Sequence, residues 1–193
     1  MSPDPPLVKP IAAVLYRDDT LLEQCLARLE AAFSPVDCRG AAHRFDLTDY
    51  YAPEMGSGLC RVLVSFSALR APPFLVDARH TAAATEDAFR LEEKQRVHVD
   101  VGYLDLYKVV LASWKGRGHK LYLDRGVWAD IVLTFAKGRF HPLPWSFPDF
   151  RAGRYDAELR AMRRRYLRQL RGAGPQRERG ERESPRRSVN HCE

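Results

Sequence analysis

The chain of 193 residues has no apolar run close to the roughly 20 residues that cross a bilayer. Its first ten residues, MSPDPPLVKP, also lack the charged segment followed by an apolar segment that marks a secretory signal. Both absences argue against a membrane or secreted protein. We therefore expect a cytoplasmic protein without a membrane span.

Cysteine is scarce, and the chain contains only Cys25, Cys38, Cys60 and Cys192. No two of them form a C-x-x-C pair, and the first three lie in apolar or strand-like segments. A zinc site needs closer spacing of cysteine and histidine. We expect free thiols and no metal site, and the sequence identifies no cofactor.

Several motifs of enzymes and nucleotide-binding proteins are missing. The chain contains no G-x-x-x-x-G-K-[ST], G-x-G-x-x-G, G-x-S-x-G or H-E-x-x-H segment. It also has no H-x-[ST] pair, which counts against a two-histidine phosphoesterase acting on RNA. The standard sites that depend on these motifs are therefore not expected.

The positive charge of the chain, +6 overall, is concentrated near its end. Residues 151–193 contain 13 of the 31 basic and 6 of the 25 acidic residues, a balance of +7. The remaining 18 basic and 19 acidic residues give residues 1–150 a balance of −1. The body of the chain thus lacks the surplus of positive charge that is typical of a nucleic-acid-binding domain.

The first half of the sequence predicts a strand, a helix, further strands and a second helix. IAAVLY (11–16) has strand character, and Thr20 with Glu23 forms a capping box before an apolar helical face that ends ahead of Pro35. Strands are expected near 43–45 and at 61–66. The second helix is expected to start at PPFLVDARH.

The second half is rich in β-branched and aromatic residues and predicts a meander. Turn signals at Lys115–Gly118, Asp124–Gly126 and Lys137–Gly138 each favour an antiparallel hairpin. Alternate residues of VWADIVLTF can face one side of the sheet: Val127, Ala129, Ile131, Leu133 and Phe135.

A helix over about 154–171 follows, with its arginines outward and an apolar stripe made of Tyr155, Leu159, Met162, Tyr166 and Leu170. We therefore expect a loose N-terminus (1–10), a body (11–171) and a disordered basic tail (172–193). The body is predicted to be a single α+β domain with an antiparallel or mixed sheet, a β-meander in its C-terminal half, and two or three helices packed mainly on one face.

Four stretches carry a resemblance to a known family: KPIAAVLY, FDLTDYYAPEMGSGLCRVLVSF, RVHVDVGYLDLYKVVLASWKGRGHKLYLDRGVWADI and HPLPWSFPDFR. In this order they resemble the uncharacterised bacterial and archaeal proteins of domain of unknown function 4416, over roughly residues 8–170. An aspartate–proline–glycine turn of that family reads Asp100-Val101-Gly102 here.

The resemblance implies little about function. Proteins of this family are sometimes labelled GTP-binding, but the chain has neither a P-loop nor an N-K-x-D segment that reads guanine. The residues therefore give no support to GTP binding by a standard G-domain.

Four ionisable residues are candidates for acid–base chemistry: Asp49, Glu54, His119 and Asp130. Asp49 and Glu54 lie in the polar loop FDLTDYYAPEMG, where carboxylates can equally cap a turn or lie in solvent. His119 begins a strand beside a basic turn, although a lone histidine is more often structural.

Six residues are candidates for ligand binding: Tyr51, Asp100, Tyr103, Lys108, Lys115 and Arg117. One of the adjacent Tyr50 and Tyr51 is expected in the core, and the other can stack on a base or sugar or lie on the rim of the domain. Lys108 can pair with a buried acid such as Asp130, or it can extend its ammonium group into solvent. The basic turn around Lys115 can bind phosphate or be solvated.

The function favoured by these residues is binding of a nucleotide-like or anionic ligand. The alternatives are a phosphate-ester hydrolase or transferase, and an RNA-associated accessory protein that acts through its arginines. The tail can add weak, non-specific affinity for nucleic acid. The sequence does not distinguish an enzyme from a binding protein, and it leaves the oligomeric state open.

Overall fold

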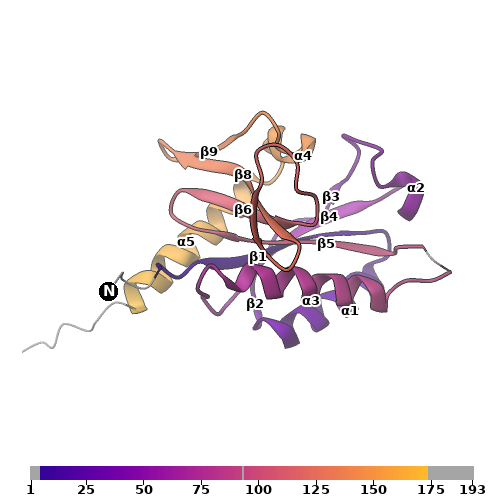
Figure 1. Ribbon diagram of the computed structural model, residues 1–193, viewed down its shortest axis with the longest axis horizontal. Coiled ribbons are helices and arrows are strands. Elements are labelled where there is room, and N and C mark those ends of the chain that lie inside the picture. Colours follow the sequence, from indigo (N-terminus) through magenta and orange to yellow (C-terminus); the bar gives the residue numbers. More distant parts are fainter. Residues whose placement is uncertain (1–4, 93, 174–193) are drawn as a thin grey trace, which may run out of the picture.

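Strand β1 (Lys9–Tyr16) runs through the middle of the sheet, and all of its residues are buried. It pairs antiparallel with β4 (Cys60–Phe66) on one side and with β5 (Val97–Leu104) on the other. Alternate residues of a strand point to opposite faces, so burial of the whole strand requires a cover on both faces. The computed structural model, which describes residues 5–92 and 94–173, shows that both covers are helical (Figure 1).

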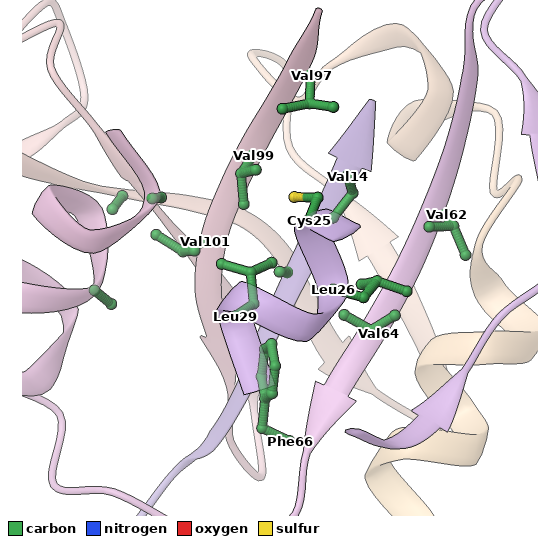
Figure 2. Packing of buried hydrophobic residues seen from close by; sticks show 14 of the residues in the cluster. Val14, Cys25, Leu26, Leu29, Val62, Val64, Phe66, Val97, Val99 and Val101 are labelled. Carbon is green, nitrogen blue, oxygen red and sulfur yellow. The ribbon is translucent and has the colours of Figure 1, made fainter. Parts of the chain in front are cut away.

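Helices α1 (Asp19–Ala32) and α3 (Phe74–Ala88) cover one face and lie together below the strands in Figure 1. Their apolar side chains pack on alternate residues of β1, β4 and β5, and Figure 2 shows Leu26 and Leu29 of α1 over valines of these strands. The buried face of α1 contains the residues expected from the sequence: Leu21, Leu22, Cys25, Leu26 and Leu29. The cap of α1 differs from the expectation, because Asp18 and not Thr20 accepts the first backbone N–H groups.

Helix α5 (Asp156–Ala173) covers the opposite face of the sheet. The predicted stripe packs there against β1, β4, β5 and β6, with Leu159, Met162 and Tyr166 fully enclosed. The short helix α4 (Pro148–Arg151) leads into α5 and buries Phe150 in the same cluster. Two long helices therefore share one face, and the third covers the other.

The sheet has the order β2-β4-β1-β5-β6-β8-β7, with β3 also paired to β4 and β9 to β8. All of these pairings are antiparallel. The elements not yet placed are β2 (Val36–Arg39), β3 (His43–Arg44), α2 (Ala52–Met55), β6 (Lys108–Ser113), β7 (Leu121–Asp124), β8 (Val127–Ala136) and β9 (Arg139–Pro142). Within the described residues, five helices and nine strands confirm the prediction of a single α+β domain with an antiparallel sheet.

Three details of the β-rich half differ from the expectation. Lys115–Gly118 does not join paired strands, because β8 lies between β6 and β7, so this segment crosses over the end of β8. The register of β6 with β8 shifts between Val109 and Val110. As a result Ile131 packs on the cluster of α1 and α3, whereas Leu133 packs on that of α5.

Strands β5 and β6 are paired over only a short length. Gly102, Tyr103 and Leu104 are opposite Leu111, Val110 and Val109, and the first half of β5 has no pairing with β6. A Cβ atom at Gly102 would lie 2.1 Å from the carbonyl oxygen of Val110, so the strands come closest where only glycine fits. The turn that the family resemblance implied at Asp100–Gly102 is instead a continuous part of β5.

The ends of the expected body shift slightly. Strand β1 begins at Lys9, so two residues of the N-terminal stretch expected to be loose belong to the sheet. Helix α5 continues to Ala173, and the rest of the expected tail lies outside the described residues. None of the helices in the described part of the chain is long and apolar enough to cross a membrane.

Candidate ligand-binding cavity

A cavity of about 480 Å³ opens where β5 and β6 diverge. The loop that holds α2, the two strands, and the segment 114–120 after β6 surround it. Its volume falls within the range that small-molecule sites occupy. The lining residues are Phe45, Thr48, Tyr50, Tyr51, Glu54, Arg79, Gln95, His98, Asp100, Leu111, Ala112, Ser113, Trp114, Lys115, Lys120, Asp130, Phe147 and Pro148.

Two charged side chains of α3 occupy the position that a neighbouring strand would take beside β5. The backbone N–H of Val99 donates to Glu86 Oε1 over 2.7 Å, and the carbonyl of Val99 accepts from Arg79 Nη1 over 3.2 Å. Gln95 donates in the same way to the carbonyl of Val97 over 3.0 Å. These bonds satisfy the backbone of β5 where β6 has moved away, and they keep the gap between the strands open.

A buried arginine lies behind the cavity. Arg61 of β4 is fully enclosed and donates to Asp149 over 2.7 Å and to Asp100 over 3.1 Å. Its guanidinium also lies 4.5 Å from the centre of the Phe45 ring. Tyr155 donates to the same oxygen of Asp149 over 2.6 Å. The strand register places Arg61 beside these groups. Arg61 is opposite Leu15 in the sheet, so its side chain points to the face of the sheet that holds the cavity.

His98 lies across β1 from Arg61, since it too is opposite Leu15. Its ring contacts Asp100 over 3.1 Å and Glu86 over 3.0 Å. Burial acts to lower the pKa of His98, but the two carboxylates outweigh it and raise this pKa to about 9. Burial alone would raise the pKa of Asp100, yet the cations His98 and Arg61 hold it well below its usual range. The imidazole is thus positively charged at neutral pH.

Aromatic rings form the wall of the cavity on the side of α2. Tyr51 is buried on Leu15, Met55 and Leu59, and its ring lies 4.7 Å from that of His98. Tyr50 is 60% exposed and contacts the ring of Tyr51 edge-on. This agrees with the expectation that one of the two tyrosines belongs to the core. Burial, followed by the nearby charge of Asp100, raises the pKa of Tyr51, so its hydroxyl stays protonated.

The opposite side of the cavity carries lysine and serine. Lys120 Nζ donates to Ser113 Oγ over 2.9 Å and lies 3.2 Å from Asp130 Oδ2. The other oxygen of Asp130 contacts His119 over 2.9 Å. Lys115 reaches across the opening to the hydroxyl of Tyr50 and lies over its ring. Two ammonium groups therefore line the cavity: Lys115 at its exposed opening, and Lys120 in a more buried position beside Asp130.

Five of the residues proposed from the sequence line this cavity: Glu54, Asp130, Tyr51, Asp100 and Lys115. Glu54 has no hydrogen bond or ion pair from its carboxylate to any residue that the structure describes. Asp100 and Asp130 are committed to ion pairs with cationic neighbours. These positions make the five residues the core of the candidate site.

The other five proposed residues lie elsewhere. His119 contacts Asp130 from outside the lining and stacks on Trp145 at 4.1 Å. Asp49 and Arg117 are exposed. Tyr103 packs on the cluster of α1 and α3, because it is three positions after Asp100 and therefore faces the other side of the strand. Lys108, at the start of β6, pairs with Asp105 and not with Asp130.

Several lining or supporting residues were missed from the sequence: Arg61, Arg79, Glu86, His98 and Trp114. A signal for two of them was present, since Arg79 and Glu86 are seven residues apart and thus share one face of α3 with its buried alanines. The pairing of Arg61 and His98 depends on the order of three strands, which no local pattern contains.

A second cavity, of about 710 Å³, lies on the other side of Glu54 and Gln95, which line both. It is bordered by the turn after β1, by α2 and by residues 91–92 and 94–96. Basic and acidic residues balance along it, with Arg17, Lys94 and Arg96 beside Asp18, Glu54 and Glu92. Within residues 5–92 and 94–173, no three or more His, Cys, Asp or Glu side chains gather so that they could hold a metal ion.

Comparison with known proteins gives a family and no function. No curated protein and no solved structure matches the chain. One family model, described as Domain of unknown function (DUF4416), matches residues 6–166, which include every strand and the first half of α5. The chain therefore belongs to the family described as Domain of unknown function (DUF4416).

Proposed function

We propose that the cavity between β5 and β6 binds a small ligand that combines a planar ring with an anionic group, as a nucleotide does. The observation that carries this proposal is the composition of the cavity lining. Aromatic rings and two lysines face the same cavity: Phe45, Tyr50, Tyr51, Trp114, Phe147, Lys115 and Lys120. Rings stack on planar groups, and ammonium groups bind phosphate or carboxylate.

The buried charges behind the cavity support rigid binding. Asp100 of β5 is hydrogen-bonded both to Arg61 of β4 and to His98 of β5, so the three side chains are held in fixed positions across β1. Side chains that are already ordered lose little conformational freedom when a ligand binds. The cavity is therefore preorganised on the strand side, and the adaptable residues lie in the two loops at its opening.

Calorimetric titration of the 193-residue chain with adenosine and guanosine monophosphate, and with the matching nucleosides, tests the proposal. We expect the monophosphates to bind at least tenfold more tightly than the nucleosides, because a hydrogen bond to a charged group contributes about 1.5–3 kcal/mol. The substitution Lys120→Gln removes one of the two ammonium groups, so it should weaken binding of the monophosphates severalfold and leave binding of the nucleosides unchanged. Lys137→Gln, in the exposed turn between β8 and β9, is the matched control and should change nothing.

Two outcomes would overturn the proposal. One is the absence of binding of all four compounds at millimolar concentration. The other is unchanged affinity for the monophosphates in a correctly folded Lys120→Gln variant, which would place the anionic group elsewhere.

A second function, hydrolysis of a phosphate ester, has one observation in its favour. The carboxylate of Glu54 reaches the cavity without a hydrogen bond or ion pair to any described residue, so it is available as a general base. If the protein is a hydrolase, Glu54→Gln should abolish release of phosphate from the monophosphates while leaving their binding intact. Release of phosphate at the same rate in this variant would exclude Glu54 as the base.

A further inference from the structure

The outer face of α5 carries a line of arginines that the small-molecule site does not use. Arg160, Arg164, Arg168 and Arg171 follow one another at intervals of four, four and three residues, so they lie on one side of the helix. All four are exposed, and Arg165 is exposed beside them. The line spans about 16 Å, at 1.5 Å per residue. We name these four residues the arginine stripe.

No interaction within the described part of the chain accounts for the stripe. None of its four guanidinium groups takes part in an ion pair with a described residue. From Leu159 to Ala173 the helix contains six arginines and no acidic residue. Like charges four residues apart destabilise a helix. Arg171, in the last turn, is favoured by the helix dipole. The other three arginines repel one another and make no compensating ion pair with a described residue.

Arg163 of α5 differs from the stripe, because it makes contacts within the fold. Its guanidinium donates to the carbonyl of Leu106 over 3.0 Å and lies 3.7 Å from the centre of the Phe135 ring. It points toward the sheet, between the apolar residues of the helix. The stripe points the other way, into solvent, where a partner can reach it.

We infer that the arginine stripe binds the phosphate backbone of a nucleic acid. Guanidinium groups bind phosphate in a bidentate manner, and a row of them one helical turn apart matches an extended polyanion better than a single small anion. This inference concerns a different surface from the cavity and does not rest on the function proposed for it.

An anionic membrane is the other extended partner with phosphate groups, and the packing of α5 argues against it. A helix that binds a membrane surface inserts an exposed apolar face. The apolar face of α5 is already used, because Leu159, Met162 and Tyr166 are buried against the sheet. Charge alone remains on the free face, and this suits a nucleic-acid backbone.

The test compares two triple variants of the 193-residue chain that lose the same charge. In the stripe variant, glutamine replaces Arg160, Arg164 and Arg168, which removes most of the stripe. In the control variant, glutamine replaces Arg28, Arg44 and Arg139, which are exposed and also lack an ion pair among the described residues. Binding of labelled 20-nucleotide RNA and DNA, single-stranded and duplex, is measured by fluorescence anisotropy between 50 and 200 mM salt.

We expect the stripe variant to bind duplexes at least tenfold more weakly at 50 mM salt. Its plot of log affinity against log salt should be shallower by about two to three units, since each lost phosphate contact removes about 0.7–0.9. The control variant should stay within about twofold of the unchanged chain. The affinities for RNA and DNA should differ by only a few-fold when both are single-stranded or both are duplex, because the contacts are to phosphate.

The inference is overturned if the stripe variant keeps the affinity and salt dependence of the unchanged chain, which would assign binding to other arginines, including those after residue 173. Equal losses in both triple variants would also overturn it, since net charge alone would then explain them. A stripe-dependent association with vesicles of anionic phospholipid, without affinity for either nucleic acid, would identify the membrane as the partner instead.

Discussion

At the scale of single residues, Arg61 is the side chain on which the interior of the domain depends most. It is fully buried between the carboxylates of Asp100 and Asp149. Removing one partner of a buried ion pair leaves uncompensated charge and typically costs about 3–5 kcal/mol. We expect Arg61→Met to lower the free energy of unfolding, measured by urea titration, by an amount in this range.

Arg39 supplies the control for this prediction. It pairs with Glu23 at the surface, and its side chain is 44% exposed. Exposed ion pairs contribute about 0–1 kcal/mol, so Arg39→Met should have a small effect. A similar loss in the free energy of unfolding for both variants would mean that Arg61 does not form the buried ion pairs with Asp100 and Asp149.

His98 gives the domain a predicted dependence on pH. Its pKa is raised from 6.5 to about 9, so its contribution to stability is complete below pH 6.5 and is lost as the pH rises through 9. The shift corresponds to about 3 kcal/mol. Asp100 does not interfere, because its lowered pKa affects stability only under acidic conditions.

Urea unfolding at pH 6 and at pH 9 tests this dependence. The unchanged chain should lose stability between the two conditions, and His98→Gln should lose much less. An equal loss in both proteins would show that His98 is not the group that titrates.

The sequence predicted part of the site at this scale. The polar loop, Tyr51 and Asp100 were recognisable because their residue types are unusual in their segments. Arg61 and His98 were not, since each looks like an ordinary polar residue in a strand, and only the antiparallel register beside Leu15 brings them together. Lys108 was assigned to the wrong acid because Asp105, three residues away, is closer than any partner on the next strand.

At the scale of elements, side chains of α3 form the hydrogen bonds with the backbone of β5 that a neighbouring strand would otherwise form. Glu86 accepts the backbone N–H of Val99, and Arg79 donates to the carbonyl of the same residue. We expect Glu86→Ala to destabilise the domain by about 1–3 kcal/mol, the cost of a buried donor without a partner. Hydrogen exchange of the Val99 amide should accelerate markedly in this variant.

Asp87→Ala is the matched control for Glu86→Ala. Asp87 is the next residue, is 66% exposed and pairs only with Arg90 among the described residues. Its removal should change stability by less than about 0.5 kcal/mol. If both variants leave the exchange of Val99 unchanged, the edge of β5 is protected by something other than α3.

The order of helices and strands was largely predictable, whereas their pairing was not. Periodicity identified β1, α1, β4 and α5 to within a few residues. The segment Lys115–Gly118 was expected to join neighbouring strands, but hydrophobic pattern does not specify which strand lies beside which. The insertion of β8 between β6 and β7 makes this segment a crossover, and that places Lys115 and Lys120 at the cavity.

At the scale of the whole molecule, two charged features lie on separate surfaces. The cavity combines cations and carboxylates in fixed pairs, and its excess charge is small. From Leu159 onward, the outer face of α5 carries arginines and no acidic residue. This division explains why the bulk charge of the sequence, which is concentrated after residue 150, gave no information about the cavity.

Mapping of ligand contacts by nuclear magnetic resonance tests the central claim, that the space between β5 and β6 is the ligand site. The ¹⁵N-labelled chain is titrated with adenosine monophosphate, and the backbone amide shifts are followed. We predict the largest changes at Tyr51, His98, Ser113 and Lys120, which surround the cavity. Changes confined to α5, or the absence of any change at these four amides at saturating ligand, would contradict the claim.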